Sequence, residues 1–245
     1  MSNGKLRWMQ VQIAGKMALV MQARFNRRRV EAMRGKTMSV DTIDNIADLI
    51  AHLGVPPERI RLKPPPGFAT EEDVLRLEPC FELIDGILVE RAMGYYESRL
   101  GAVLIHFLED YLELQDLGIV LGADGMMRLE IGQVRIPDVA FYSWEHFPER
   151  LLPLEKILSA VPDLPVEILS AGNTVKEMLR KRREFFAGGT KLMWIVHPEE
   201  RTVDVYTSVD QFTTLTESEK LDGGTVLPGF SLSIRDWFER AGKRG

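Results

Sequence analysis

The chain of 245 residues has one cysteine, Cys80, and four scattered histidines. A single cysteine excludes an intramolecular disulfide and suits a reducing compartment, so the sequence favours a cytoplasmic location. The histidines show no zinc-type spacing, so a bound metal is expected to have oxygen ligands. No run of about 18 uncharged apolar residues occurs, and we therefore expect neither a transmembrane helix nor a membrane partner.

No glycine-rich phosphate loop follows any predicted strand, so neither a Rossmann nor a P-loop assignment is supported. Positive charge is concentrated at the start of the chain. Residues 1–38 carry nine lysines and arginines against one glutamate, a net charge of +8, and the remainder carries −13 of the total of −5. So acidic a body is not typical of an avid nucleic-acid binder. For residues 1–39 we favour a poorly ordered basic extension, or a start codon placed too far upstream, over an arm that contacts nucleic acid.

The rest of the sequence predicts a lead-in and one main domain. Residues 41–53 show helical spacing, with Asp41 as a cap and Gly54 as a stop. The Pro64-Pro65-Pro66-Gly67 run is typical of an extended linker, and residues 70–73 indicate the start of a short helix. We therefore assign residues 40–78 to a helical, Pro-rich lead-in and residues 79–240 to the main domain.

Within the main domain, the periodicity of apolar residues predicts alternating groups of strands and helices. The expected elements are a hairpin at 81–89, a helix at 95–115, strands at 118–122, 126–131, 134–142 and 164–169, a helix at 174–187, strands at 192–196 and 203–207, and a helix near 234–240. Thr174 and Glu177 match a capping box. This order is typical of an α+β or mixed α/β fold, in which helices pack against a mixed sheet.

Two acidic residues lie in apolar, strand-like runs: Asp138 within 134–141 and Glu167 within 164–170. Burying a carboxylate costs several kcal/mol or forces its protonation. A charge retained there indicates a cationic partner, and two at once indicate a shared divalent metal. The alternative is that both are surface carboxylates on edge strands, or are paired with Arg135 or with the basic cluster at 180–183. On a regular strand, Asp138 would share a face with Val134, Ile136 and Ala140.

The helix after Glu167 supplies a candidate base. At ~100° per residue, Arg182 lies near the middle of its apolar stripe and Lys181 lies on the flank. A lysine on the flank can pack its stem on the core while its ammonium reaches a polar cleft. The alternative for the whole basic cluster of this helix is a solvated face.

Four short motifs occur in a fixed order: 81–86 (FELIDG), 136–138 (IPD), 166–170 (VEILS), and Lys181-x-x-x-Phe185 followed by Gly189 and 193–196 (MWIV). Together they resemble the Uma-two family of restriction-endonuclease-like proteins, in the PD-(D/E)xK nuclease superfamily. The resemblance covers roughly residues 80–235 and implies a mixed sheet flanked by helices. It also implies Mg²⁺ or Mn²⁺ as the cofactor, with Asp138, Glu167 and Glu82 as metal ligands and with Lys181 as the catalytic base-side residue.

Three positions depart from that pattern. Leu169 stands two residues after Glu167, where the superfamily commonly has a lysine, so the lysine must come from the helix. Arg182 stands where an apolar residue is expected, and His197 where an aspartate is expected before the proline.

The leading hypothesis is a metal-dependent endonuclease that hydrolyses phosphodiester bonds of DNA. A first alternative is a catalytically silent nuclease fold that binds or regulates, which the missing strand lysine and the acidic body favour. A second is a glycosidase with Asp138 and Glu167 as an acid/base pair, although aromatic residues for sugar stacking are not evident near them. DNA is the expected partner, and because cutting both strands of a duplex favours two sites, a homodimer is a further expectation.

Overall fold

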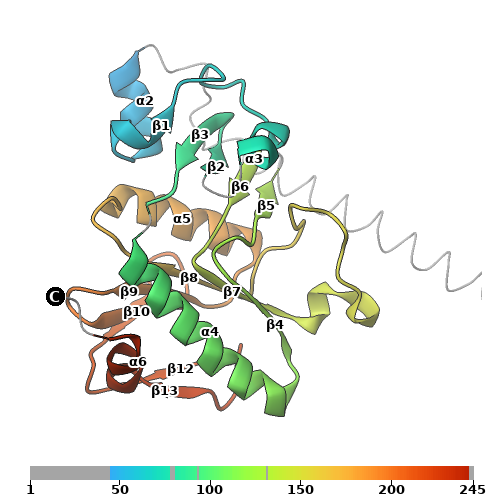
Figure 1. The fold of residues 1–245 in the computed structure, drawn as a ribbon, viewed down its shortest axis with the longest axis vertical. Coiled ribbons are helices and arrows are strands. Elements are labelled where there is room, and N and C mark those ends of the chain that lie inside the picture. Colours follow the sequence, from blue (N-terminus) through green and yellow to red (C-terminus); the bar gives the residue numbers. More distant parts are fainter. Residues whose placement is uncertain (1–44, 78–80, 93, 131, 243–245) are drawn as a thin grey trace, which may run out of the picture. The chain divides into compact units, whose positions relative to one another are not determined.

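The structure, a computed structural model, describes residues 45–77, 81–92, 94–130 and 132–242. This part of the chain contains two larger β-sheets, one small two-stranded sheet and flanking helices (Figure 1). The predicted basic extension at 1–39 and the predicted cap Asp41 lie outside these ranges. The helices are α2 (Ile46–Leu53), α3 (Glu71–Leu77), α4 (Tyr95–Gln115), α5 (Val175–Gly188) and α6 (Ile234–Ala241), and the 3₁₀ turns are η2 (Pro57–Arg59), η3 (Trp144–His146) and η4 (Pro148–Arg150). None of these helices is both long enough and apolar enough to cross a bilayer.

The smaller sheet has five antiparallel strands in the order β1-β3-β2-β6-β5. Its strands are β1 (Ile60–Arg61), β2 (Phe81–Ile84), β3 (Ile87–Glu90), β5 (Met127–Glu130) and β6 (Gln133–Arg135). The predicted hairpin is confirmed, because Asp85 and Gly86 join β2 to β3 with φ of 51° and 72°, the left-handed backbone that such a two-residue turn requires. A Cβ on Gly86 would also lie 2.6 Å from the backbone of Gly67, so a larger residue does not fit there.

The larger sheet has six strands in the order β11-β10-β9-β8-β7-β4. They are β4 (Gly118–Leu121), β7 (Val139–Ser143), β8 (Leu164–Ile168), β9 (Met193–His197), β10 (Thr202–Tyr206) and β11 (Phe212–Leu215). β8 and β9 are parallel and joined through α5, whereas the other pairs are antiparallel. The predicted mixed sheet with flanking helices is therefore confirmed. β11 and the small pair β12 (Lys220–Asp222) and β13 (Ser231–Ser233) were not predicted.

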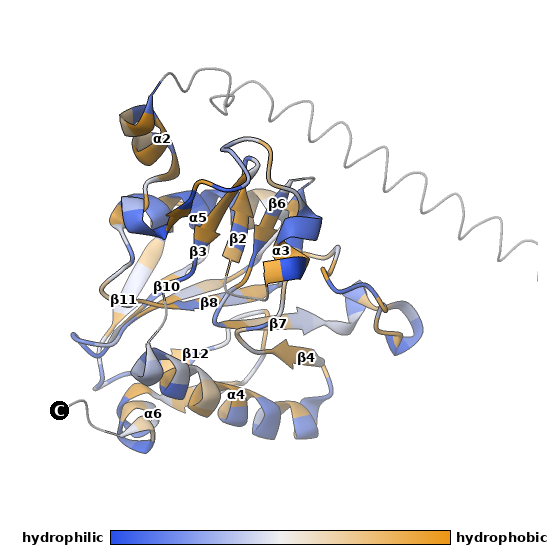
Figure 2. Ribbon diagram, turned by 45° about the horizontal axis from the view of Figure 1, so that its top comes forward, coloured by the Kyte–Doolittle hydropathy of each residue, from blue (hydrophilic) through white to orange (hydrophobic). Residues whose placement is uncertain are grey.

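Residues on β8 alternate between two helical layers, which decides where Glu167 points. Leu164, Val166 and Ile168 pack in the core beneath α4 and α6. Glu167 projects from the opposite face, where its carboxylate accepts a hydrogen bond from Lys181 of α5. Figure 2 shows hydrophobic colour along β2, β3 and β4 and alternating bands on α4, as expected for a helix with one face on the core.

The prediction of one strand over residues 134–142 is wrong. The run divides into β6 in the smaller sheet and β7 in the larger sheet. Pro137 has no N–H for a strand ladder. The Ile136 N–H donates to the Glu82 carboxylate at 3.2 Å, and the Asp138 N–H donates to the Val166 carbonyl at 3.1 Å, so each turns to a different sheet. Asp138 consequently lies at the crossing between the sheets and does not share a strand face with Val134.

The start of α5 follows the sequence prediction and is held by the lead-in. Thr174 and Glu177 form the reciprocal capping box, and Gly189 ends the helix with a positive φ. The lead-in helix α2 ends at Gly54, as predicted, and the Gly54 carbonyl accepts a hydrogen bond from the Thr174 hydroxyl. Lys176 donates to the Ala51 carbonyl in the same way. The lead-in therefore packs directly on the helix that carries Lys181.

Candidate functional site

Lys181 contacts two of the predicted site residues, Glu167 and Glu82. Its Nζ lies 2.8 Å from Glu167 Oε2 and 3.2 Å from Glu82 Oε1. Glu167 comes from the middle of the larger sheet, Glu82 from the smaller sheet, and Lys181 from the second turn of α5. All three are buried, with 5%, 1% and 4% of their surfaces exposed. The structure thus brings these three residues together, although they are up to 99 positions apart in the sequence.

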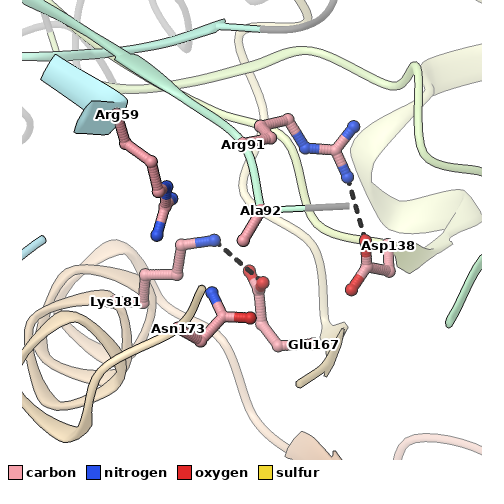
Figure 3. A pocket seen from close by; sticks show the side chains of 7 residues that line it. All are labelled: Arg59, Arg91, Ala92, Asp138, Glu167, Asn173 and Lys181. Carbon is pink, nitrogen blue, oxygen red and sulfur yellow. Dashed lines mark hydrogen bonds and ion pairs between the residues drawn. The ribbon is translucent and has the colours of Figure 1, made fainter. Parts of the chain in front are cut away.

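A small pocket opens beside Lys181 and contains the fourth predicted residue, Asp138. Its volume of about 10 Å³ is the size that holds one water molecule or ion. Asp138 Oδ1 accepts a hydrogen bond from the Arg91 guanidinium at 2.9 Å, and its Oδ2 accepts one from the Ile168 N–H at 2.7 Å. The residues lining the pocket are Arg59, Arg91, Ala92, Asp138, Glu167, Asn173 and Lys181 (Figure 3).

Burial raises the pKa of Glu167 to about 7, and the negative charges of Asp138 and Glu82 add to this effect, although the Lys181 ammonium opposes it. Burial also raises the pKa of Asp138, against the opposing effect of Arg91. For Lys181, burial alone would lower the pKa, but Glu167 and Glu82 outweigh it and raise the pKa. The pocket therefore contains two carboxylates that are costly to ionise beside an amine that keeps its proton.

Glu82 lies on the other side of Lys181 and is not among the residues lining the pocket. Its Oε2 accepts from the Arg135 guanidinium at 2.8 Å, and its Oε1 accepts from the Ile136 N–H. Arg135 in turn contacts Glu184 of α5 at 2.6 Å. Burial alone would raise the pKa of Glu82, but Lys181 and Arg135 lower it to about 2. Both oxygens of Glu82 are thus engaged with protein groups.

The pocket residues fit a hard divalent cation with oxygen ligands. Asp138 and Glu167 both line the pocket, and Glu167 Oε1 is buried with no hydrogen-bond partner in the part of the chain that the structure describes. Mg²⁺ is commonly bound by proteins through one or two carboxylates. Within the described ranges, no group of three or more Asp, Glu, His or Cys side chains is arranged to hold a metal. Glu82 as a third ligand stays a prediction.

Two cationic residues of the pocket were not predicted from the sequence. Arg91 follows β3 directly, and Arg59 comes from the η2 turn of the lead-in. Neither lies in a motif that identifies it, because each reaches the pocket only through the tertiary fold.

Two of the three departures from the family pattern have partners of their own. Arg182 lies over the Tyr206 ring, 4.3 Å from the ring centroid. His197 Nε2 lies 2.9 Å from Asp204 Oδ2. Leu169 packs among the apolar residues on the α5 side of the sheet. None of the three lines the pocket.

Comparison with known proteins yields a family and a fold. The model of the Uma2 family, described as "Putative restriction endonuclease", matches residues 71–235. The crystal structure of a "putative nuclease" from Anabaena variabilis ATCC 29413 is similar at a TM-score of 0.61 and 21% identity, covering 70% of this chain and 98% of that chain. No curated protein sequence matches. Because the family model spans more than half of the sequence, the chain belongs to the Uma2 family and has a restriction-endonuclease-like nuclease fold.

Proposed function

We propose that the protein is a Mg²⁺- or Mn²⁺-dependent endonuclease that hydrolyses phosphodiester bonds of DNA at the Asp138–Glu167–Lys181 pocket. The observation that carries this proposal is the meeting of two carboxylates of raised pKa with one ammonium in a single pocket. Glu167 comes from strand β8, Asp138 from the crossing between the two sheets, and Lys181 from helix α5. Such clusters of shifted ionisable groups are typical of functional sites.

Asp138 and Glu167 would hold the cation through their oxygens. When bound, the ion polarises the scissile phosphate and lowers the pKa of a coordinated water. It also offsets the negative charge of the two carboxylates, so that an acidic protein can accept a phosphate there.

Lys181 supplies the positive charge for the chemical step. Its ammonium, held by Glu82 on one side, stabilises negative charge developing on the phosphate oxygens. Arg91, which contacts Asp138, gives the pocket a second cation at 2.9 Å from that carboxylate. Arg91 and Lys181 are thus two cationic groups of the pocket that could contact a phosphate.

A plasmid cleavage assay tests the proposal. We expect the wild type to nick and linearise plasmid with Mg²⁺ or Mn²⁺ and to stop when EDTA is added. Asp138→Asn, Glu167→Gln and Lys181→Met should each lower the rate by about 100-fold or more, since each removes a group that acts in the transition state. Arg150→Met, which changes an exposed residue remote from the pocket, is the matched control. Equal cleavage by the wild type and the three pocket variants would contradict the assignment.

One observation favours the alternative of a silent module that binds nucleic acid. Each carboxylate of the site is paired with a protein cation: Asp138 with Arg91, Glu167 with Lys181, and Glu82 with Arg135. A site that stabilises itself in this way needs no metal to be neutral. Binding of DNA that is unaffected by EDTA, with no cleavage across metal and protein concentrations, would support this alternative.

A further inference from the structure

Arg59 reaches the pocket from outside the region that matches the family. It lies in the η2 turn, 12 residues before the match begins at residue 71, and only 9% of its surface is exposed. Figure 3 shows its side chain among those that line the pocket together with Lys181. We propose that Arg59 is a positioning residue of the site, which holds the Glu177 carboxylate so that the Lys181 ammonium stays on Glu167 and Glu82. The inference rests on the proposed function for its kinetic consequence only.

The contacts of Arg59 are with three segments that surround the pocket. Its Nε donates to the Glu90 carbonyl at 2.7 Å, at the end of β3. Its Nη1 donates to the Gly172 carbonyl at 2.8 Å, in the turn between β8 and α5. Nη1 and Nη2 then donate to the two oxygens of Glu177 at 2.9 and 2.8 Å. This bidentate geometry suits the fixed fork of a guanidinium and is not available to lysine.

Glu177 is the natural competitor for the Lys181 ammonium. The two residues are four apart on α5, so they share a face of the helix. Glu177 is 2% exposed, and an unpaired carboxylate there would be costly. Burial alone would raise the pKa of Glu177, but Arg59 and Lys181 together lower it, consistent with the spacing of Glu177 and Lys181 on α5. Glu177 Oε2 also accepts from the Asn173 amide and the Thr174 N–H, but Arg59 is the cation that hydrogen-bonds to both of its oxygens. While Arg59 holds this position, the Lys181 ammonium remains available to Glu167 and Glu82.

Hydrogen bonds attach the lead-in to helix α5, and this attachment places Arg59 at the pocket. The Gly54 carbonyl accepts from Thr174, the residue that caps α5. Six residues further along α5, the Arg180 guanidinium donates to the His52 carbonyl at 3.5 Å and contacts Asp85 at 2.6 Å. These contacts fix α2 and η2 on the helix that carries both Glu177 and Lys181. The lead-in is thus a part of the site in this chain.

Steady-state kinetics of four variants of the full chain test the inference. Arg59→Ala should lower kcat by about 10- to 100-fold with KM changed less than about threefold, since a displacement of about 1 Å can cost that much. The kcat of Arg59→Lys should lie between those of the wild type and Arg59→Ala. Adding Glu177→Gln to Arg59→Ala removes the competing charge and should restore at least about tenfold of the lost kcat. Arg61→Ala, at an exposed arginine two residues away, is the matched control and should leave kcat unchanged.

A role that is only structural would lower thermal stability without the recovery by Glu177→Gln, so failure of the double variant to recover would overturn the inference. Should Arg59→Ala not fold, Arg59→Lys decides: a kcat equal to that of the wild type would overturn it.

A crystal structure of Arg59→Ala separates this inference from the proposed function. We expect Lys181 Nζ to lie within hydrogen-bond distance of Glu177 in place of Glu167. If the amine has moved while no preparation cleaves DNA, the positioning role stands and the nuclease assignment fails. If the wild type cleaves DNA and the amine in Arg59→Ala remains on Glu167, the assignment stands and the positioning role fails.

Discussion

Glu82 and Glu167 contact the same Lys181 ammonium, but the regions around them differ in how fully their polar atoms are paired. On one side of Lys181, Glu82 belongs to a closed network with Arg135 and Glu184. On the other side, Glu167 faces the pocket with one oxygen that has no hydrogen-bond partner within the described residues. The pKa of Glu82 is lowered to about 2, whereas that of Glu167 is raised to about 7.

The difference follows from the number of cations that each carboxylate has. Both are almost fully buried, so both lose a similar amount of hydration. Glu82 has two cationic partners and a backbone N–H, whereas Glu167 has Lys181 alone and the negative charge of Asp138 nearby. We infer that the Glu82 side stabilises the fold, and that the Glu167 side, where one carboxylate oxygen has no hydrogen-bond partner within the described residues, is the side that can accept an ion.

Disrupting the network of Glu82, Arg135 and Glu184 should cause the largest loss in the free energy of unfolding. Arg135→Met leaves Glu82 and Glu184 without their shared cation, and loss of one partner of a buried ion pair costs about 3–5 kcal/mol. Urea denaturation should show a decrease of this size in the free energy of unfolding. A loss under about 1 kcal/mol would mean that the network does not hold the sheets together.

The pH dependence of stability should separate the two carboxylates. Glu167 has a folded pKa above its ordinary value, so its ionisation destabilises the fold as the pH rises from about 4.5 to 7. Glu167→Gln should therefore gain on the wild type over this interval, by an amount of the order of 3 kcal/mol at most.

Glu82 should show the reverse dependence. Its folded pKa is lowered, so its contribution is present above about pH 4.5 and is lost as the pH falls toward 2. Glu82→Gln should be less stable than the wild type near neutral pH, and this difference should shrink in acid. Urea titrations at several pH values check both variants. If the free energy of unfolding varied with pH in the same way for Glu82→Gln and Glu167→Gln, the two carboxylates would not differ as described.

Metal binding should change the stability of the wild type by a smaller amount and should distinguish the Glu167 side from the Glu82 side. Mn²⁺ at about ten times its dissociation constant should stabilise the wild type by about 1.4 kcal/mol, since it binds the folded chain alone. The rise in Tm should disappear in Glu167→Gln and persist in Arg61→Ala, which changes an exposed arginine. Differential scanning calorimetry with and without EDTA measures it, and an equal rise in Glu167→Gln would place the ion elsewhere.

The smallest effect is expected for an ion pair outside both regions. Arg150 contacts Asp116 at 2.7 Å, but both side chains are more than half exposed. Arg150→Met should change the free energy of unfolding by less than about 1 kcal/mol, because water screens such a pair. The same urea measurement checks it, and a loss comparable to that of Arg135→Met would show that burial is not what distinguishes the two arginines.

Elements specified by local sequence could be predicted, and those that depend on distant contacts could not. The α4 helix, the Asp85-Gly86 turn and the Thr174 cap each follow from neighbouring residues. The break at Pro137 was missed because the apolar pattern continues across it while the hydrogen bonds change sheets.

The same division holds within the site. Lys181 and Glu167 were predicted from strand and helix periodicity together with the family motifs, and the structure places them in contact. Arg59 and Arg91 have no local signature, since their partners are brought to them from more than 30 positions away. Their importance becomes visible only when the fold is assembled.

The crossing at Ile136-Pro137 has a consequence for how the two sheets are coupled. The only residues between Arg135, which anchors one sheet, and Asp138, which enters the other, are these two, and proline fixes its own φ near −65°. So short and stiff a connection ties the backbone position of Asp138 closely to that of the smaller sheet, so a substitution that shifts β6 is also expected to displace the Asp138 carboxylate.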